Sequence, residues 1–138
     1  MFILNKSNVI VFFPILILLR VLHIDDSPEI CELYSDMFTA DKSTIQSVNT
    51  GKEGLSLVLK NDYDLILLDM CMPQYSGMDF LRDLTKQRSS ELRKVVVSVL
   101  KFNENQIKEL LKFGIHSVEG KPTDLQKLEI IKKNIWLR

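Results

Sequence analysis

Three carboxylates, one hydroxyl and one ammonium group lie at or near the ends of short apolar segments in this 138-residue sequence. They are Asp25, Asp26, Asp69, Ser98 and Lys121. A carboxylate can attack phosphorus to form an acyl phosphate, while a metal ion, a lysine and a hydroxyl orient and neutralise the transferred group. Carboxylates that crowd together repel one another by roughly 1 to 4 kcal/mol per close pair at surface-like dielectric constants, so a cation is expected among them. If the fold brings these groups together, the pattern predicts phosphoryl acceptance on an aspartate with Mg²⁺.

Asp69 is the candidate for the reacting carboxylate. It ends the apolar run 65–68 within the stretch DLILLDMCMP, residues 64–73. The run is too short for a helix and too continuous for an exposed strand, which predicts a strand buried on both faces. Ligands bind at the carboxyl ends of the strands in an open parallel sheet, so Asp69 lies where a reacting side chain is expected.

Apolar periodicity predicts five strands that alternate with five helices. The expected strands are 21–24, 43–48, 65–68, 94–100 and 116–119. The first helix starts at Ser27, and the other four are expected at 53–60, 78–87, 104–113 and 124–137. This alternation predicts an α/β fold with a doubly wound parallel sheet covered by helices on both faces. All strand ends that carry the charged groups then share one edge of the sheet.

Composition excludes several classes of protein. Lys plus Arg and Asp plus Glu each total 18, so no global field attracts nucleic acid. We interpret Lys132 and Lys133 as a solvated helix face, because no cluster of aromatic residues or arginines accompanies them. Two cysteines are too few for a disulfide framework or a zinc quartet, and we expect reduced thiols in a cytoplasmic protein.

Residues 1–19 form an apolar extension ahead of a predicted domain at 20–138. Its run 9–19 contains eleven residues, and a helix of that length would reach only about 16 Å across a hydrocarbon core of roughly 30 Å. Pro14 would also interrupt such a helix. Three interpretations stay open: a disordered or surface-packed tail, a shallow membrane attachment and a secretory signal, although no small-residue cleavage site follows.

Several motifs occur in an order that resembles the receiver domain of two-component response regulators. They are VLHIDDS, DLILLDMCMP followed by SGMDFL, then Ser98, and EGKP, and the similarity runs from Arg20 to the C-terminus. The resemblance implies a flavodoxin-like (β/α)5 fold with strand order 2-1-3-4-5, similar to stand-alone chemotaxis regulators.

The same resemblance implies a role for each candidate residue. Asp69 would be the phosphoacceptor, Ser98 would hydrogen-bond the phosphoryl group, and Lys121 would pair with it. Mg²⁺ would be held by Asp25, Asp26 and Asp69 together with the backbone carbonyl of Cys71. A histidine kinase or phosphotransfer protein would donate the phosphate.

The expected output is contact with another protein, because no residues remain after the last predicted helix for a DNA-binding or enzymatic domain. The family's usual partner surface corresponds here to 104–113, 116–119 and 124–137. A phosphorelay intermediate is equally compatible. The chain would be a self-phosphorylating and self-dephosphorylating acceptor, not a turnover enzyme.

Three positions depart from the family pattern. Val118 stands where the family has an aromatic residue that follows the hydroxyl of Ser98, so the common readout lacks its ring. Cys71 and Leu100 stand where side chains help orient the hydrolytic water, which predicts slow self-dephosphorylation. Two alternatives follow: a pseudo-receiver that is not phosphorylated, and a phosphohydrolase with an aspartate nucleophile, although such enzymes usually have an acid at the position of Cys71.

Overall fold

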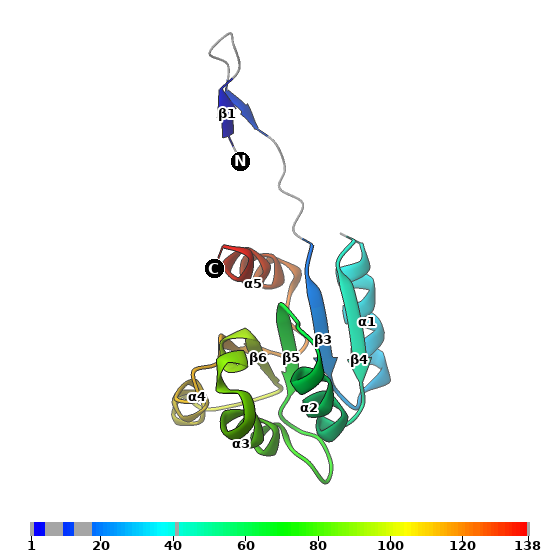
Figure 1. The fold of residues 1–138 in the computed structure, drawn as a ribbon, viewed down its shortest axis with the longest axis vertical. Coiled ribbons are helices and arrows are strands. Elements are labelled where there is room, and N and C mark those ends of the chain that lie inside the picture. Colours follow the sequence, from blue (N-terminus) through cyan, green and yellow to red (C-terminus); the bar gives the residue numbers. More distant parts are fainter. Residues whose placement is uncertain (1, 5–9, 13–17, 41, 138) are drawn as a thin grey trace.

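A five-stranded parallel sheet forms the centre of the molecule (Figure 1). This computed structural model describes the backbone of residues 2–4, 10–12, 18–40 and 42–137, with side chains for 18–40 and 42–137. The strands follow the order β4 (Thr44–Val48), β3 (Arg20–Ile24), β5 (Leu65–Asp69), β6 (Val95–Val99) and β7 (Ser117–Gly120). Numbered from Arg20, that order is 2-1-3-4-5, so the predicted doubly wound, flavodoxin-like α/β fold is confirmed.

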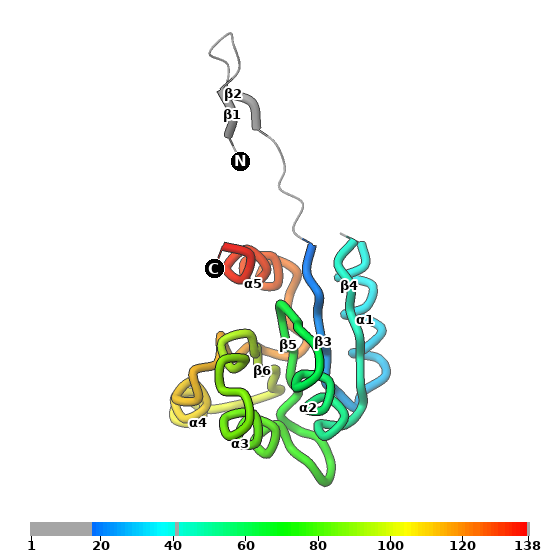
Figure 2. The backbone as a smooth tube through the Cα atoms, viewed as in Figure 1, coloured from blue at the N-terminus to red at the C-terminus, as the bar shows by residue number. Residues whose placement is uncertain are grey.

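Helices cover both faces of the sheet. One face packs against α1 (Pro28–Thr39) and α5 (Leu125–Trp136), and the other against α2 (Gly51–Lys60), α3 (Gly77–Arg88) and α4 (Glu104–Leu111). Neighbouring residues of a strand point to opposite faces, and in β5 Leu65 and Leu67 join one apolar cluster while Ile66 and Leu68 join the other. The backbone in Figure 2 alternates between strand and helix from β3 to α5.

Each of these helices begins after a polar capping residue. The caps are Ser27, Thr50, Ser76, Asn103 and Asp124, and each side chain accepts a hydrogen bond from a backbone N–H of the first turn. The cap at Thr50 explains why α2 starts two residues before the predicted position 53.

A short 3₁₀ helix, η1 (Ser89–Lys94), was not predicted. It has no apolar periodicity of its own, and ion pairs hold its buried Glu91 to Arg88 at 3.4 Å and to Lys94 at 2.8 Å.

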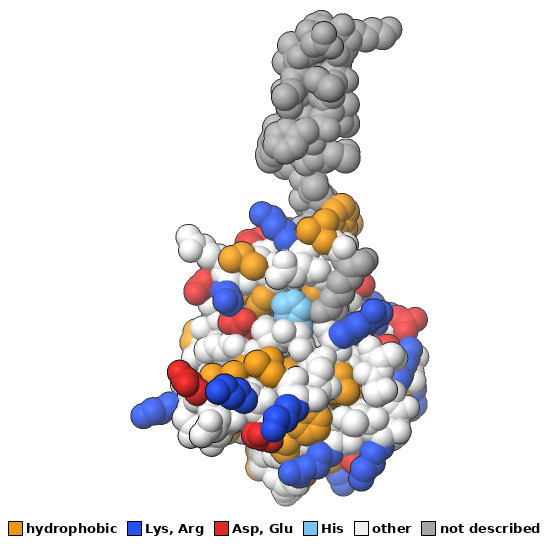
Figure 3. All heavy atoms as spheres, turned by 90° about the vertical axis from the view of Figure 1, so that its left-hand side faces the viewer, with side chains coloured by type: hydrophobic (Ala, Val, Ile, Leu, Met, Phe, Trp, Pro, Cys, Tyr) orange, Lys and Arg blue, Asp and Glu red, His pale blue; other side chains and the backbone are white. Residues whose placement is uncertain are grey.

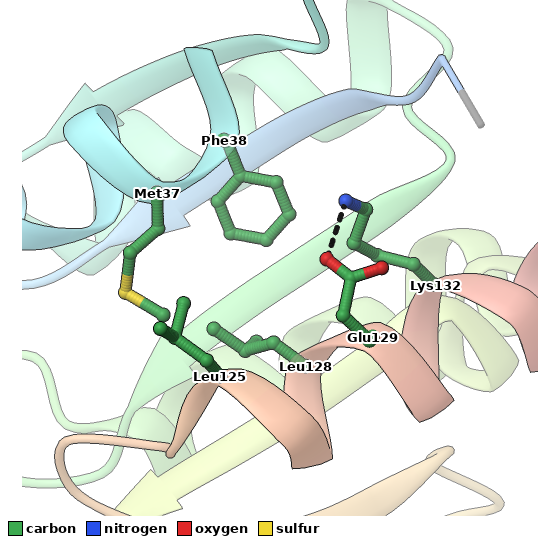
Figure 4. Close-up of a pocket in the computed structure, with 6 residues that line it drawn as sticks. All are labelled: Met37, Phe38, Leu125, Leu128, Glu129 and Lys132. Atoms are coloured by element: carbon green, nitrogen blue, oxygen red, sulfur yellow. Dashed lines mark hydrogen bonds and ion pairs between the residues drawn. The ribbon is translucent and has the colours of Figure 1, made fainter. Parts of the chain in front are cut away.

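The interpretation of Lys132 as a solvated side chain is wrong. Lys132 lies on α5 with 4% of its surface exposed, and its Nζ lies 5.8 Å from the centre of the Phe38 ring of α1. Figure 4 shows its ammonium group paired with Glu129, at 3.1 Å, in a small pocket between α1 and α5. Lys133, its neighbour, is exposed as expected.

Most of the apolar extension lies outside the described residues. Its described backbone contains two short strands, β1 (Phe2–Leu4) and β2 (Ile10–Phe12), which pair antiparallel. The three interpretations of residues 1–19 therefore stay predictions. Among the described residues, none of the helices has both the length and the apolar character to cross a membrane.

Candidate functional site

The carboxyl edge of the sheet brings the predicted site residues together. Asp69 ends β5 and is paired in register with Ser98 of β6, while Asp25 directly follows β3 and Lys121 follows β7. The strands run parallel, so residues separated by up to about a hundred positions in the sequence share this edge.

Lys121 lies between two buried carboxylates. Its Nζ is 2.8 Å from Asp25 Oδ2 and 3.3 Å from Asp69 Oδ2. The Lys121 side chain is 10% exposed, and those of Asp25 and Asp69 are 0% and 3% exposed. Burial strengthens these ion pairs, because little water remains to screen them.

The surroundings shift the pKa values of Asp69, Asp25 and Lys121 in different directions. Burial raises the pKa of Asp69, as does the nearby charge of Asp25, and together they outweigh the backbone N–H of Cys71 and the charge of Lys121. Burial also opposes ionisation of Asp25, but contacts with His23 and Lys121 hold its pKa below the usual value. Burial alone would lower the pKa of Lys121, yet the two carboxylates raise it. The Lys121 ammonium group is therefore stabilised in its charged form. Of the two buried carboxylates, Asp69 is the one whose negative charge its surroundings stabilise less.

The acidic residues form a set of oxygen donors that fits a hard divalent cation. One carboxylate oxygen from each of Asp25, Asp26 and Asp69 lies within 4.8 Å of the others. Asp25 Oδ2 and Asp69 Oδ2 are buried, and in the described part of the chain their polar contacts are the ion pairs with Lys121 and, for Asp25, with His23. Such oxygens suit Mg²⁺, which prefers one or two carboxylates, waters and phosphate oxygens.

Cys71 lies in the loop after β5, with an exposed thiol. Its backbone N–H donates to Asp69 Oδ1 at 3.1 Å, which turns this loop toward the Asp69 carboxylate. A role of its carbonyl as a metal ligand stays a prediction.

Ser98 and Val118 occupy neighbouring strands near the site. Ser98 is buried, and its Oγ donates to the carbonyl of Leu68 at 3.4 Å. Val118 is partly buried against the apolar cluster of the α2–α3–α4 face. Its branched aliphatic side chain stands in place of the aromatic ring that the family resemblance leads one to expect. Leu100 follows β6 and is 81% exposed.

The position of His23 within a strand favours a satisfied or partly exposed histidine over a metal ligand, and its contact with the site was not predicted. His23 is fully buried in β3, with Nε2 3.6 Å from Asp25 Oδ2 and Nδ1 3.3 Å from Ser47 Oγ. Its ring meets the ring of Tyr34 edge-on, with 4.8 Å between centroids. A signal was available, because residues two apart in a strand point to the same face, which directs His23 and Asp25 to one side.

Comparisons with known proteins agree with this geometry. The model of the response regulator receiver domain family matches residues 21–132. The receiver domain of the Francisella response regulator 1452 superposes with a TM-score of 0.78 at 28% identity, covering 87% of this chain and 98% of that one.

Curated relatives are longer proteins. The probable C4-dicarboxylate response regulator DctR of Bacillus subtilis is 32% identical over 111 residues, which cover 79% of this chain and 48% of that protein. The aerobic respiration control sensor protein ArcB of Escherichia coli is 32% identical over 98 residues, or 68% of this chain and 12% of that protein. The chain thus spans about half of one relative and a small part of the other, and by the family match it belongs to the response regulator receiver domains.

Proposed function

We propose that this receiver domain accepts a phosphoryl group on Asp69, with Mg²⁺, and signals through contact with another protein. The observation that carries the proposal is the buried cluster in which Lys121 Nζ lies 3.3 Å from Asp69 Oδ2 and three carboxylate oxygens lie within 4.8 Å of one another. A structural turn needs no such concentration of charge at a strand end.

Each residue of the cluster has a chemical part in this transfer. A carboxylate oxygen of Asp69 forms a bond to phosphorus while the bond from phosphorus to the donor nitrogen breaks and its electron pair stays on the donor. The product is an acyl phosphate. Lys121 and the Ser98 hydroxyl would pair with the phosphoryl oxygens, which is supported by the 3.3 Å contact of Lys121 with Asp69 and by the register of Ser98 with Asp69.

Asp25, Asp26 and Asp69 would hold the magnesium ion together with the carbonyl of Cys71. The bound ion would offset the charge that builds up on the phosphoryl oxygens. Without it, the incoming phosphate would meet three carboxylates and a single lysine in this cluster.

A histidine kinase or a phosphotransfer protein would supply the phosphoryl group. This proposal draws on the family and on the likeness to the sensor protein ArcB. A cytoplasmic setting is proposed as well, which the free thiols of Cys31 and Cys71 support.

The surface formed by α4, β7 and α5 is proposed to contact the downstream target. Figure 3, which shows the side of the molecule on which α4 and α5 lie, displays apolar patches separated by charged side chains of both signs. Exposed apolar residues on the two helices are Leu111, Leu125, Ile130 and Trp136. Apolar centres with polar rims are typical of protein interfaces, and on the described part of this surface no basic stripe suited to nucleic acid accompanies them.

Intact-mass spectrometry tests the acceptor. The protein is incubated with Mg²⁺ and either acetyl phosphate or phosphoramidate, with Asp69→Asn as the matched variant. We expect a gain of one phosphoryl group in the wild-type protein only. Equal labelling of the variant would move the acceptor elsewhere. The protein could instead fold and bind magnesium but take up no phosphoryl group, either from these two donors or from a histidine phosphotransfer protein. That result would favour a pseudo-receiver.

The same reactions separate a receiver from a phosphohydrolase. Many turnovers of phosphate release from small phosphomonoesters would indicate an enzyme. We expect none, because the position of a second acid, two residues after Asp69, is occupied by Cys71.

A further inference from the structure

We infer that His23 is a positioning residue that holds Asp25 in place for the divalent cation. The inference rests on the proposed function, because it assigns a role in building the magnesium site. It concerns a side chain that neither carries the phosphoryl group nor binds the ion.

The surroundings of His23 are the first support. Its strand, β3, lies between β4 and β5, and His23 is paired in register with Ser47 on one side and Leu67 on the other. The imidazole is fully buried on the α1–α5 face, where apolar packing is the rule. Buried polar rings need partners, and both of the polar atoms nearest to the ring nitrogens belong to side chains of neighbouring segments.

The two partners determine how the ring proton is placed. Asp25 Oδ2 can only accept a hydrogen bond when it is ionised, so Nε2 must carry a proton toward it. In a neutral ring Nδ1 is then the acceptor, and the Ser47 hydroxyl at 3.3 Å is its donor. Asp25 thus selects the tautomer with the proton on Nε2, and the Ser47 hydroxyl, which can donate or accept, satisfies Nδ1 in that tautomer and holds the ring in place.

Asp25 needs such a donor because its cationic partner, Lys121, is shared. Lys121 contacts both Asp25 and Asp69, and in the proposed transfer it follows the phosphoryl group on Asp69. His23 is held in the middle of a parallel sheet, so its position does not depend on the phosphoryl group. Nε2 and Oδ2 are 3.6 Å apart. A shift of a few tenths of an ångström would bring them within hydrogen-bond distance.

Tyr34 links His23 to the loop that carries the lysine. The tyrosine ring packs edge-on against the imidazole. Its hydroxyl donates to Thr123 Oγ1 at 3.3 Å and accepts from the Thr123 N–H at 3.2 Å, two residues beyond Lys121. The side chain of Tyr34 thus contacts both His23, which lies next to Asp25, and Thr123, which follows Lys121 in the chain.

The alternative is that His23 only fills space in the core. A space-filling role predicts that an apolar residue of similar size replaces it without effect on the cation. A positioning role predicts that the donor matters, and that a side chain with a donor at the same reach restores the site. His23→Leu and His23→Gln make this distinction, because the glutamine Nε2 can take the place of the imidazole Nε2–H.

Isothermal titration with MgCl₂ is the test, on the full chain without phosphoryl donor. We expect His23→Leu to raise the magnesium dissociation constant by about tenfold to a hundredfold, the usual effect of losing a group that orients a metal ligand. His23→Gln should stay within about threefold of wild type, and Ser47→Ala should fall between the two. Thr44→Ala is the control on the same strand, since Thr44 is exposed and two residues of β4 separate it from Ser47.

Two results would overturn the inference. One is a folded His23→Leu that binds magnesium within about threefold of wild type. The other is a loss of affinity that is equal in His23→Leu and His23→Gln, which would indicate a packing defect. If His23→Leu does not fold, Ser47→Ala takes its place, because Ser47 is exposed and its substitution leaves the core unchanged. An unchanged magnesium dissociation constant in Ser47→Ala then decides against the inference.

Nitrogen-15 NMR of the imidazole gives an independent readout that does not need the ion. We expect the tautomer with the proton on Nε2 in the wild-type protein, because the Asp25 carboxylate beside it can only accept. A wild-type ring protonated on Nδ1 alone would exclude the donor to Asp25. A wild-type protein that shows the expected tautomer but neither binds magnesium nor takes up phosphate would instead contradict the proposed function.

Discussion

Asp69 carries a charge that the folded protein only partly compensates. Its pKa is raised by burial and by the charge of Asp25, which means that folding makes the ionised form less favourable. A carboxyl group with a raised pKa destabilises the fold wherever it is ionised. The penalty is fully present above the folded pKa and absent below the unfolded value near 3.8.

Asp69→Asn is therefore expected to unfold at a higher denaturant concentration than wild type at neutral pH in EDTA. The gain should shrink as the pH falls through the folded pKa of Asp69, and vanish below the unfolded value. Urea titrations at several pH values measure it. Asp62→Asn, at an exposed carboxylate away from the site, is the control. A variant less stable than wild type at neutral pH would mean that the pair with Lys121 outweighs burial.

In the proposed function, Cys71 and Leu100 would influence how easily water reaches an acyl phosphate on Asp69. Both side chains are exposed beside the site, and neither is suited to hold a water molecule by hydrogen bonds. We expect slow self-dephosphorylation, measured as decay of a radiolabel. Cys71→Asn combined with Leu100→Glu should accelerate it by roughly tenfold or more, because a positioned polar group assists attack by water. Leu125→Glu, on α5, is the exposed-leucine control. A wild-type half-life of seconds would contradict this account.

At the scale of elements, α3 begins directly beside Asp69. Ser76 Oγ accepts from the Asp79 N–H at 3.2 Å, and the Asp79 carboxylate accepts from the Ser76 N–H at 2.9 Å. Gly77 follows, and a Cβ there would lie 2.8 Å from the backbone oxygen of Asp69. The start of α3 thus contacts the strand end that carries Asp69.

Ser76→Ala should lower the free energy of unfolding by about 1 kcal/mol, the usual loss when a helix loses its N-cap. The capping box would lose one of its two hydrogen bonds, while the Asp79 carboxylate would still accept from the backbone. Denaturant titration measures the change. Ser89→Ala, at the exposed other end of α3, should have little effect. Equal losses in both variants would show that the cap is unimportant.

Lys132 is a charged residue of α5 that is buried instead of exposed. Burial lowers its pKa, so its charge is unfavourable there despite the pair with Glu129. Lys132→Met keeps the aliphatic stem against Phe38 and removes the buried charge. We expect a gain of about 1 kcal/mol in the free energy of unfolding, because the buried ammonium group is removed while the remaining Glu129 carboxylate is 56% exposed and stays solvated. Lys133→Met should change little. A destabilised Lys132→Met would show that the ammonium group is required.

The whole molecule shows what the sequence could predict and what it could not. Continuous apolar runs such as 65–68 predicted the buried strands, and the polar residues after them predicted which groups meet at the sheet edge. The contacts of Lys132 could not be predicted, because they depend on how α1 packs against α5. The contact of His23 with Ser47 also required the pairing of β3 with β4, which periodicity alone does not provide.

Magnesium should stabilise the molecule as a whole, because the cluster joins the ends of separate strands. Three carboxylates and one lysine leave two uncompensated negative charges at the edge of the sheet. A ligand that binds only the folded state adds about 2.7 kcal/mol at a hundred times its dissociation constant. We expect the melting temperature to rise with MgCl₂ and to return to its starting value in EDTA. Sodium chloride at matched ionic strength controls for screening.

Asp26→Asn is the sharpest variant for this prediction. Asp26 is the exposed member of the cluster, so its loss should hardly change the melting temperature in EDTA. The rise with MgCl₂ should nevertheless become much smaller, since one of three carboxylate ligands is gone. If the wild-type melting temperature does not respond to MgCl₂, the cluster is only a buried charge network held by Lys121. If Asp26→Asn responds as wild type does, the ion binds without this carboxylate, through Asp25 and Asp69 alone.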